Sequence, residues 1–195
     1  MALRSEDGFT LVELLMVVVL LGVISAIALS GLTASMRTAR QSNDRIEALA
    51  DLQRNIERVA QVVRVADGED YPVGTPGQLL LADGNDIRLD VRRGTDLIRY
   101  RYWRATSASG EPELRLCREV YTPPDDPCAT ATGQPVLTDL ANDGATPLFS
   151  YLDAEGAAAT GDDIAQVGIT LVRDLPTQPA IEVQTTVQLR NAERA

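Results

Sequence analysis

The dominant feature of the hydrophobic pattern is an apolar run over residues 9–36, in which Glu13 is the only charged residue. A helix of that length rises about 1.5 Å per residue, or about 42 Å in all, whereas the hydrocarbon core of a bilayer is about 30 Å thick. The run therefore predicts a membrane-spanning helix. A carboxylate in such a helix costs up to about 2.5 to 3.5 kcal/mol at the bilayer centre, and less near an end. Glu13 is thus a candidate functional residue.

A second pattern continues the same helix. Apolar residues recur at spacings of three, four and seven while charged residues fall between them, which is typical of an amphipathic helix; the apolar members are Ile46, Leu49, Ile56, Val59 or Ala60, and Val63. Pro72, Gly74, Pro76 and Gly77 then make a turn-rich exit. We expect one helix over about residues 9–66, with its first half in a membrane and its second half packed on a domain.

The remaining chain alternates apolar and polar residues between polar turns, which predicts antiparallel strands near residues 87–91, 97–103, 113–121, 166–173 and 181–190. In the last of these, Ile181, Val183, Val187 and Leu189 share one face, and the opposite face is expected to be wet. Subtracting the first 36 of the 195 residues leaves enough chain for one domain of ordinary size. The expected fold class is α+β, with a long N-terminal helix packed on an antiparallel sheet.

The composition restricts the kinds of catalytic and binding site that the chain can form. The chain has 28 acidic and 18 basic residues, a net charge of −10 and no histidine. The absence of histidine excludes Ser-His-Asp and Cys-His catalysis and histidine-based metal sites. No basic stripe for nucleic acid is evident. We expect no catalytic residues, no cofactor and no metal site.

Acidic clusters occur at residues 83–86, 125–126, 139–143 and 162–163, and each is similar to a fragment of a calcium loop. None has the spacing of an EF-hand loop. We expect turns there, with calcium binding left open.

The two cysteines suggest a crosslink. Cys117 falls in a predicted strand and Cys128 in a proline-rich loop, so a disulfide would close a ring of about a dozen residues and contribute about 3 kcal/mol in the chain-entropy model. A disulfide fits a domain outside the cytoplasm. A reduced structural pair is the alternative.

The string GFTLVELL at residues 8–15, after a short polar leader and before the apolar run, resembles the class III signal of type IV pilin-like proteins. The resemblance implies that a membrane-embedded prepilin peptidase cuts between Gly8 and Phe9 on the cytoplasmic side and methylates the new amine of Phe9. Glu13 would then meet the Phe9-type amine of an adjacent subunit and set the axial register. The implied parts are a leader (1–8), a membrane and filament-packing helix (9–32), its amphipathic continuation (33–66) and an extracytoplasmic head (67–195).

A weaker likeness covers most of the head. The strand Tyr100-Arg101-Tyr102, the strand Leu114-Arg115-Leu116-Cys117-Arg118 and the segment at 147–156 are similar to the J-type minor pseudopilins of type II secretion and the W-type minor pilins. This likeness implies a minor structural subunit that initiates or caps a pilus or pseudopilus. Its partners would be other minor and major subunits, and its location the cytoplasmic membrane, crossed once, with the head outside.

Two alternatives remain open. An ordinary signal peptide would end at Ala26-Ile27-Ala28, and a plain single-span anchor would carry a binding domain outside any filament, with Glu13 snorkelling to the interface. The leader is not net positive, and Arg37 and Arg40 flank the far end of the run, so the positive-inside rule does not favour an inward N-terminus. Many pilin-like helices also bend at a proline, where this chain has Ser30-Gly31. A Gly/Ser pair can permit a bend.

Overall fold

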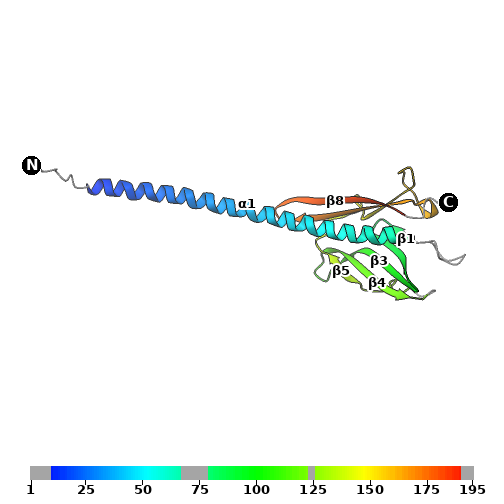
Figure 1. The fold of residues 1–195 in the computed structure, drawn as a ribbon. Helices are drawn as coiled ribbons and strands as arrows, with labels where there is room; N and C mark the ends of the chain where they lie inside the picture. The colour runs from blue at the N-terminus through cyan, green and yellow to red at the C-terminus, as the bar shows by residue number, and fades with distance from the viewer. Residues whose placement is uncertain (1–9, 67–78, 123–125, 190–195) are drawn as a thin grey trace, which may run out of the picture. The chain divides into compact units, whose positions relative to one another are not determined.

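The structure, a computed structural model, describes residues 10–66, 79–122 and 126–189. It contains one long helix followed by eight strands and a short 3₁₀ helix (Figure 1): α1 (Leu11–Val65), β1 (Leu79–Asp83), β2 (Asp86–Arg93), β3 (Asp96–Thr106), β4 (Pro112–Tyr121), β5 (Gln134–Leu137), β6 (Phe149–Leu152), η1 (Gly161–Asp163), β7 (Gln166–Leu175) and β8 (Gln178–Gln188). The expected α+β class is confirmed.

The chain divides into two compact units, residues 1–44 and 45–195. In the first unit the described residues beyond Thr10 are all helical, and α1 continues without a break through Ser30-Gly31. The second unit contains the last three quarters of the chain, including the C-terminal part of α1 and every strand. The helix expected over residues 9–66 is confirmed over Leu11–Val65.

All strand pairs in the second unit are antiparallel. Sheet A has the order β1-β2-β3-β4-β5, and sheet B has the order β6-β7-β8. The two sheets meet where the Phe149 N–H donates to the carbonyl of Gly84 at 2.9 Å. The hairpin predicted around residues 87–103 is present as β2 and β3, and Gly94 in its turn has a φ of 64°, which glycine adopts without strain.

The sequence pattern did not predict three of the strands, β1, β5 and β6. They contain only four or five residues each, too few for alternation to stand out, and β5 also contains Pro135, which is a residue typical of sheet edges. The strand predicted to reach residue 190 is confirmed as β8 up to Gln188.

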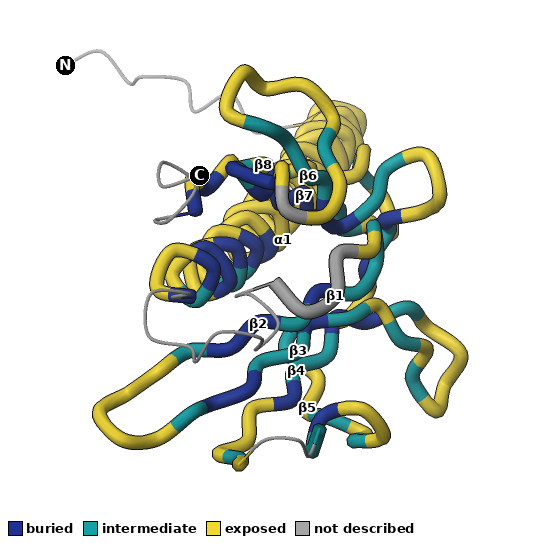
Figure 2. Tube along the Cα trace, turned by 90° about the vertical axis from the view of Figure 1, so that its right-hand side faces the viewer, coloured by how far each residue is buried: buried dark blue, intermediate teal, exposed yellow. Residues whose placement is uncertain are grey.

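Residues 45–65 of α1 lie between the two sheets, and their buried side faces both (Figure 2). The helix contributes six buried residues to a single hydrophobic core that also includes side chains of both sheets: Ala48, Leu52, Ile56, Val59, Ala60 and Val63. On β8, Ile181 and Val187 are buried, as is Leu189 just beyond it, while Glu182 and Thr186 are exposed, which confirms the expected apolar face.

The predicted apolar stripe of the helix was wrong at its N-terminal end. Ile46 is 63% exposed and Leu49 is 37% exposed, whereas Leu52, which the prediction omitted, is fully buried. At 100° per residue Ile46 lies about 120° around the helix from Leu52, so the two side chains cannot share a face. The sheets cover the stripe that begins at Ala48 and leave the neighbouring apolar flank bare.

The difference between these leucines predicts a difference in stability. Leu52→Ala should lower the free energy of unfolding by about 2 to 5 kcal/mol, because it removes a fully buried side chain and leaves a cavity. Leu49→Ala makes the same chemical change three residues away and should cost less than about 1 kcal/mol. Urea unfolding of the full chain in detergent micelles, followed by Trp103 fluorescence, measures both. Equal losses would show that the buried stripe is misassigned.

Candidate assembly site

Thr10 begins the helix as its N-cap. Its carbonyl accepts hydrogen bonds from the N–H groups of Glu13 at 3.0 Å and Leu14 at 3.2 Å, and its Oγ1 accepts from the Glu13 N–H at 3.3 Å. Thr10 and Glu13 therefore have the spacing of a capping box. Glu13 lies in the first turn, where a negative charge interacts favourably with the helix dipole by about 0.3 to 1 kcal/mol.

The helix around Glu13 presents apolar side chains on all sides. Large hydrophobic residues from Leu11 to Leu32 are 52% to 76% exposed, so nothing in the described chain covers them. The helix is long and apolar enough to cross a membrane once, and none of the most apolar window is buried. Among the described residues, the Glu13 carboxylate has no partner of opposite charge within ion-pair distance. Any counter-charge for Glu13 would therefore come from outside the described residues.

Two hydroxyl groups further along the helix are hydrogen-bonded within it. The hydroxyl of Ser30 donates to the carbonyl of Ile27 at 2.8 Å, and that of Thr33 to the carbonyls of Leu29 and Ser30 at 2.9 Å. Such back-bonding makes hydroxyls tolerable in an apolar environment. Glu13 is thus the only ionisable side chain of the described span, residues 11–36.

The sequence places the candidate cleavage site at Gly8 and Phe9, and both lie outside the described residues. Their roles, like the register role of Glu13, stay predictions. The predicted cysteine pair lies in the second unit, and the structure joins Cys117 to Cys128 by a disulfide. Glu13 and the cysteines belong to different compact units.

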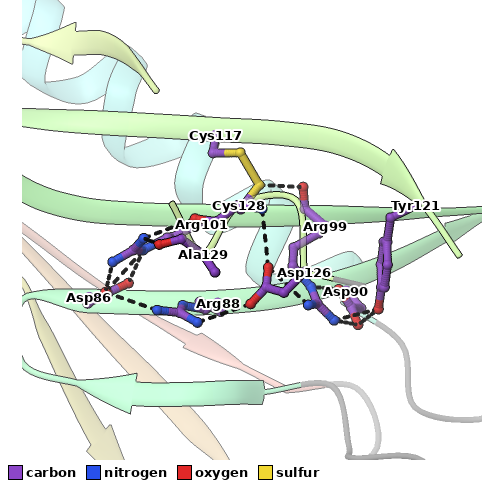
Figure 3. A network of polar contacts seen from close by, with 10 residues as sticks. All are labelled: Asp86, Arg88, Asp90, Arg99, Arg101, Cys117, Tyr121, Asp126, Cys128 and Ala129. Atoms are coloured by element: carbon purple, nitrogen blue, oxygen red, sulfur yellow. Dashed lines mark hydrogen bonds and ion pairs between the residues drawn. A yellow bond between two sulfur atoms is a disulfide. The ribbon is translucent and has the colours of Figure 1, made fainter. Parts of the chain in front are cut away.

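The disulfide holds a loop against the face of sheet A opposite the helix (Figure 3). Asp126 from this loop pairs with Arg88 of β2 and Arg99 of β3, each at 3.1 Å. Arg101 of β3 donates to the carbonyls of Cys128 and Ala129, both at 2.9 Å. The loop is therefore held by the disulfide, by the ion pairs of Asp126 and by the hydrogen bonds from Arg101.

Beneath the loop lies a buried ion pair. Asp90 is 2% exposed and accepts hydrogen bonds from Arg99 Nε at 2.9 Å and Nη2 at 3.0 Å, a bidentate arrangement. The Tyr121 hydroxyl donates to the same carboxylate and accepts from Arg99 Nη2 (Figure 3). A buried pair this fully hydrogen-bonded is costly to break, because removing one partner leaves an uncompensated charge.

The electrostatics follow from this geometry. Burial alone would lower the pKa of Arg99, but its hydrogen bonds to Asp90 and Asp126 outweigh that effect and raise the pKa above its usual range. For Asp126 burial acts in the opposite direction and would raise the pKa. The hydrogen bond and charge of Arg99 and the charge of Arg88 nevertheless hold that pKa below its ordinary value. Both groups are therefore locked in their charged forms.

Several residues of the acidic clusters make local hydrogen bonds or ion pairs. Asp83 Oδ1 accepts from the Asn85 N–H at 2.9 Å, and Asp143 Oδ1 accepts from the N–H groups of Ala145 and Thr146, as expected of turn residues. Asp126 Oδ1 likewise accepts from the Cys128 N–H at 3.2 Å, and the same carboxylate also pairs with Arg88 and Arg99. Over residues 10–66, 79–122 and 126–189 no three potential metal ligands come together.

Comparison with known families supports the interpretation of the N-terminus. Residues 3–29 match the model of the prokaryotic N-terminal methylation motif. The matched segment includes Gly8, Phe9 and Glu13, and the motif supports a type IV pilin-like protein. Such a motif implies processing by a prepilin peptidase and assembly with other pilin subunits, and with the apolar helix it suggests a single-pass membrane anchor. Among curated proteins and solved structures, no match to the chain is found.

Two features of these sites went unrecognised in the sequence. Thr10 and Glu13 show the T-x-x-E spacing of a capping box, a signal that was present there. No such signal marked the Asp90–Arg99 pair, because charged residues in an alternating strand are expected to face water. The loop that covers the pair includes Asp126, about 27 residues after Arg99.

The shifted pKa of Asp126 predicts a pH dependence. Because its folded pKa lies below the ordinary value of about 3.9, its contribution to stability is fully present above that value and is lost as pH falls through the folded pKa. Asp126→Asn should therefore reduce the free energy of unfolding by about 1 to 3 kcal/mol at pH 7, and the gap from wild type should narrow below about pH 4.

Urea unfolding between pH 3 and pH 7, with Trp103 fluorescence as the signal, measures this gap. Glu155→Gln is the control, since Glu155 is exposed and its removal should leave stability nearly unchanged at every pH. A gap for Asp126→Asn that stays constant down to pH 3 would contradict the assignment of Asp126 as the charged partner of Arg99.

Proposed function

We propose that the chain is a structural minor subunit of a type IV pilus or type II secretion pseudopilus, and that it helps to initiate or cap the filament. The observation that carries this proposal is Glu13, the only charge in the apolar run over residues 9–36, placed inside the matched methylation motif. In this proposal the leader (1–8) is removed between Gly8 and Phe9, and Phe9 becomes the methylated N-terminus.

In this proposal, cleavage supplies the positive counter-charge for the Glu13 carboxylate. It creates a cationic amine on Phe9, four positions before Glu13, near the apolar end of the helix. A carboxylate costs up to about 2.5 to 3.5 kcal/mol at the membrane centre and less near an end, and pairing with an amine on an adjacent subunit offsets this cost only when the two helices are in one axial register. Glu13 thereby selects that register among the many that an apolar helix surface would otherwise allow.

Helix packing would cover the remaining apolar surface. A side chain added at Gly22 or Gly31 would meet nothing within 4 Å, so a neighbouring backbone can approach both glycines closely. Ile46 and Leu49 extend an exposed apolar flank beyond the membrane-spanning length. Adjacent subunits in a filament would bury these side chains, which the head itself leaves uncovered.

Two observations support a minor subunit with an extracytoplasmic head. The segments that are similar to J-type pseudopilins and W-type minor pilins fall on β3, β4 and β6, so they include strands of both sheets. The Cys117–Cys128 disulfide is of a kind that persists outside the cytoplasm. The proposed location is the cytoplasmic membrane, crossed once, and the filament after assembly.

Substitution of Glu13 tests this proposal. Glu13→Gln keeps the shape and removes the charge, so the subunit should insert into the membrane at least as well as wild type but enter filaments at roughly a tenth of the wild-type level or less, the loss expected if the ion pair is worth about 1.4 kcal/mol or more. The measurement is the amount of the subunit in sheared filaments or pseudopili relative to the membrane fraction, in cells that carry the processing peptidase and assembly machinery.

Glu47→Gln is the matched control, because it removes one exposed carboxylate from the same helix outside the apolar run. It should assemble as wild type does. A helix-capping role alone would cost Glu13→Gln less than about 1 kcal/mol of helix stability and leave assembly largely intact. Undiminished incorporation of Glu13→Gln would refute the register role.

A further inference from the structure

A groove of about 350 Å³ lies in the second compact unit, along the last strand of sheet A. One wall is formed by residues 135–138, which include most of β5, and the opposite wall by one face of α1. We call it the β5 groove. Its charged lining consists of Asp51, Arg54 and Arg58 from α1 and Arg173 from β7.

The β5 groove is cationic in a strongly acidic chain. Asp51 is shared between two guanidinium groups, since its Oδ1 lies 2.5 Å from Arg54 Nη2 and its Oδ2 lies 3.4 Å from Arg173 Nη1. Arg58 has no ion pair with any described residue and is exposed. Asp51 is the one carboxylate among the lining residues against three arginines, and Asp139 beside the groove lies 3.3 Å from Arg173 Nη2, whereas the whole chain carries a net charge of −10.

The shape of the groove suits an extended chain. β5 is the last strand of sheet A, and no described strand pairs with its other edge. An open edge can accept an extended peptide by main-chain hydrogen bonding, here at the residues of β5 other than Pro135, which has no N–H, and neighbouring side chains select its sequence. None of the described residues that line the groove is aromatic, so the stacking platforms typical of single-stranded nucleic acid sites are missing from it.

We propose that the β5 groove binds an extended acidic segment of a partner protein subunit. The segment lies along β5, and its carboxylates meet Arg54 and Arg58, whose planar guanidinium groups match carboxylates bidentately. The net charge of −10 makes the chain as a whole repel acidic segments, whereas the arginines of the groove attract them.

This inference extends the proposed function from the helix to the head. It rests on the proposed function only for the source of the partner, since the groove and its charges are features of the chain itself. Binding of a peptide requires neither cleavage at Gly8 nor filament assembly. The binding test and the assembly test can therefore fail separately.

The probe is a fluorescein-labelled peptide of about ten residues with alternating Glu and Thr, added to the full chain in detergent micelles at about 50 mM salt. Fluorescence anisotropy should show saturable binding that weakens strongly at about 500 mM salt, because exposed charge pairs are screened. The double variant Arg54→Gln/Arg58→Gln should weaken binding about tenfold or more, as expected when two charge-assisted contacts are lost. Arg104→Gln, which removes an exposed arginine outside the groove, should change it less than about twofold.

Competition identifies the occupant. Excess unlabelled Glu–Thr peptide should displace the probe, and a Lys–Thr peptide of equal length should not. Displacement by inorganic phosphate or by a short oligo-dT at concentrations similar to those of the unlabelled peptide would overturn the proposal in favour of a free-anion or nucleic-acid site. No saturable binding, or equal losses in the Arg54/Arg58 and Arg104 variants, would also overturn it. Sedimentation that shows self-association through the groove would replace the partner with a second copy of this chain.

Discussion

The constraint on which this molecule depends is the placement of a single carboxylate in an apolar helix. Glu13 lies in the first turn of α1, next to the cap formed by Thr10, and large hydrophobic side chains surround it with no counter-charge within the described chain. Lipid makes such a charge expensive, and a soluble environment makes the exposed leucines and valines around it expensive. Both costs fall when helices of several subunits pack side by side with an amine opposite each carboxylate.

The second compact unit meets a different requirement, because it must fold on one face of the same helix. Leu52, Val59 and Val63 supply the centre of the core, and the two sheets enclose them. On the face of sheet A opposite the helix, ion pairs between side chains stabilise the sheet. The Asp90–Arg99 pair lies there beneath a loop that Cys128 and Asp126 hold in place. Gly133 adjoins this region with a φ of 62°, and a side chain there would collide with Trp103. The chain therefore contacts sheet A closely at Gly133.

The extent to which sequence predicts this structure depends on how local each signal is. The helix and Glu13 could be predicted because one uninterrupted apolar run carries them, and the β2–β3 hairpin could be predicted because alternation and a glycine turn lie close together in the chain. β5 could not, since four residues including Pro135 carry too little pattern. Leu52 rather than Leu49 is a core residue, and Arg99 is buried, because of the distant segments that cover them. The pattern of a single segment does not predict such contacts.

The claim that cleavage creates a positive charge at Phe9 is tested by mass spectrometry of the mature N-terminus. The protein is purified from the membranes of cells that carry the processing peptidase, and the N-terminal peptide is sequenced. The expected result is a chain that begins with N-methylated Phe9. A chain that retains Met1 would show an uncut anchor, and one that begins near Leu29 would show ordinary secretion. Either result would leave Glu13 without its partner and contradict the claim.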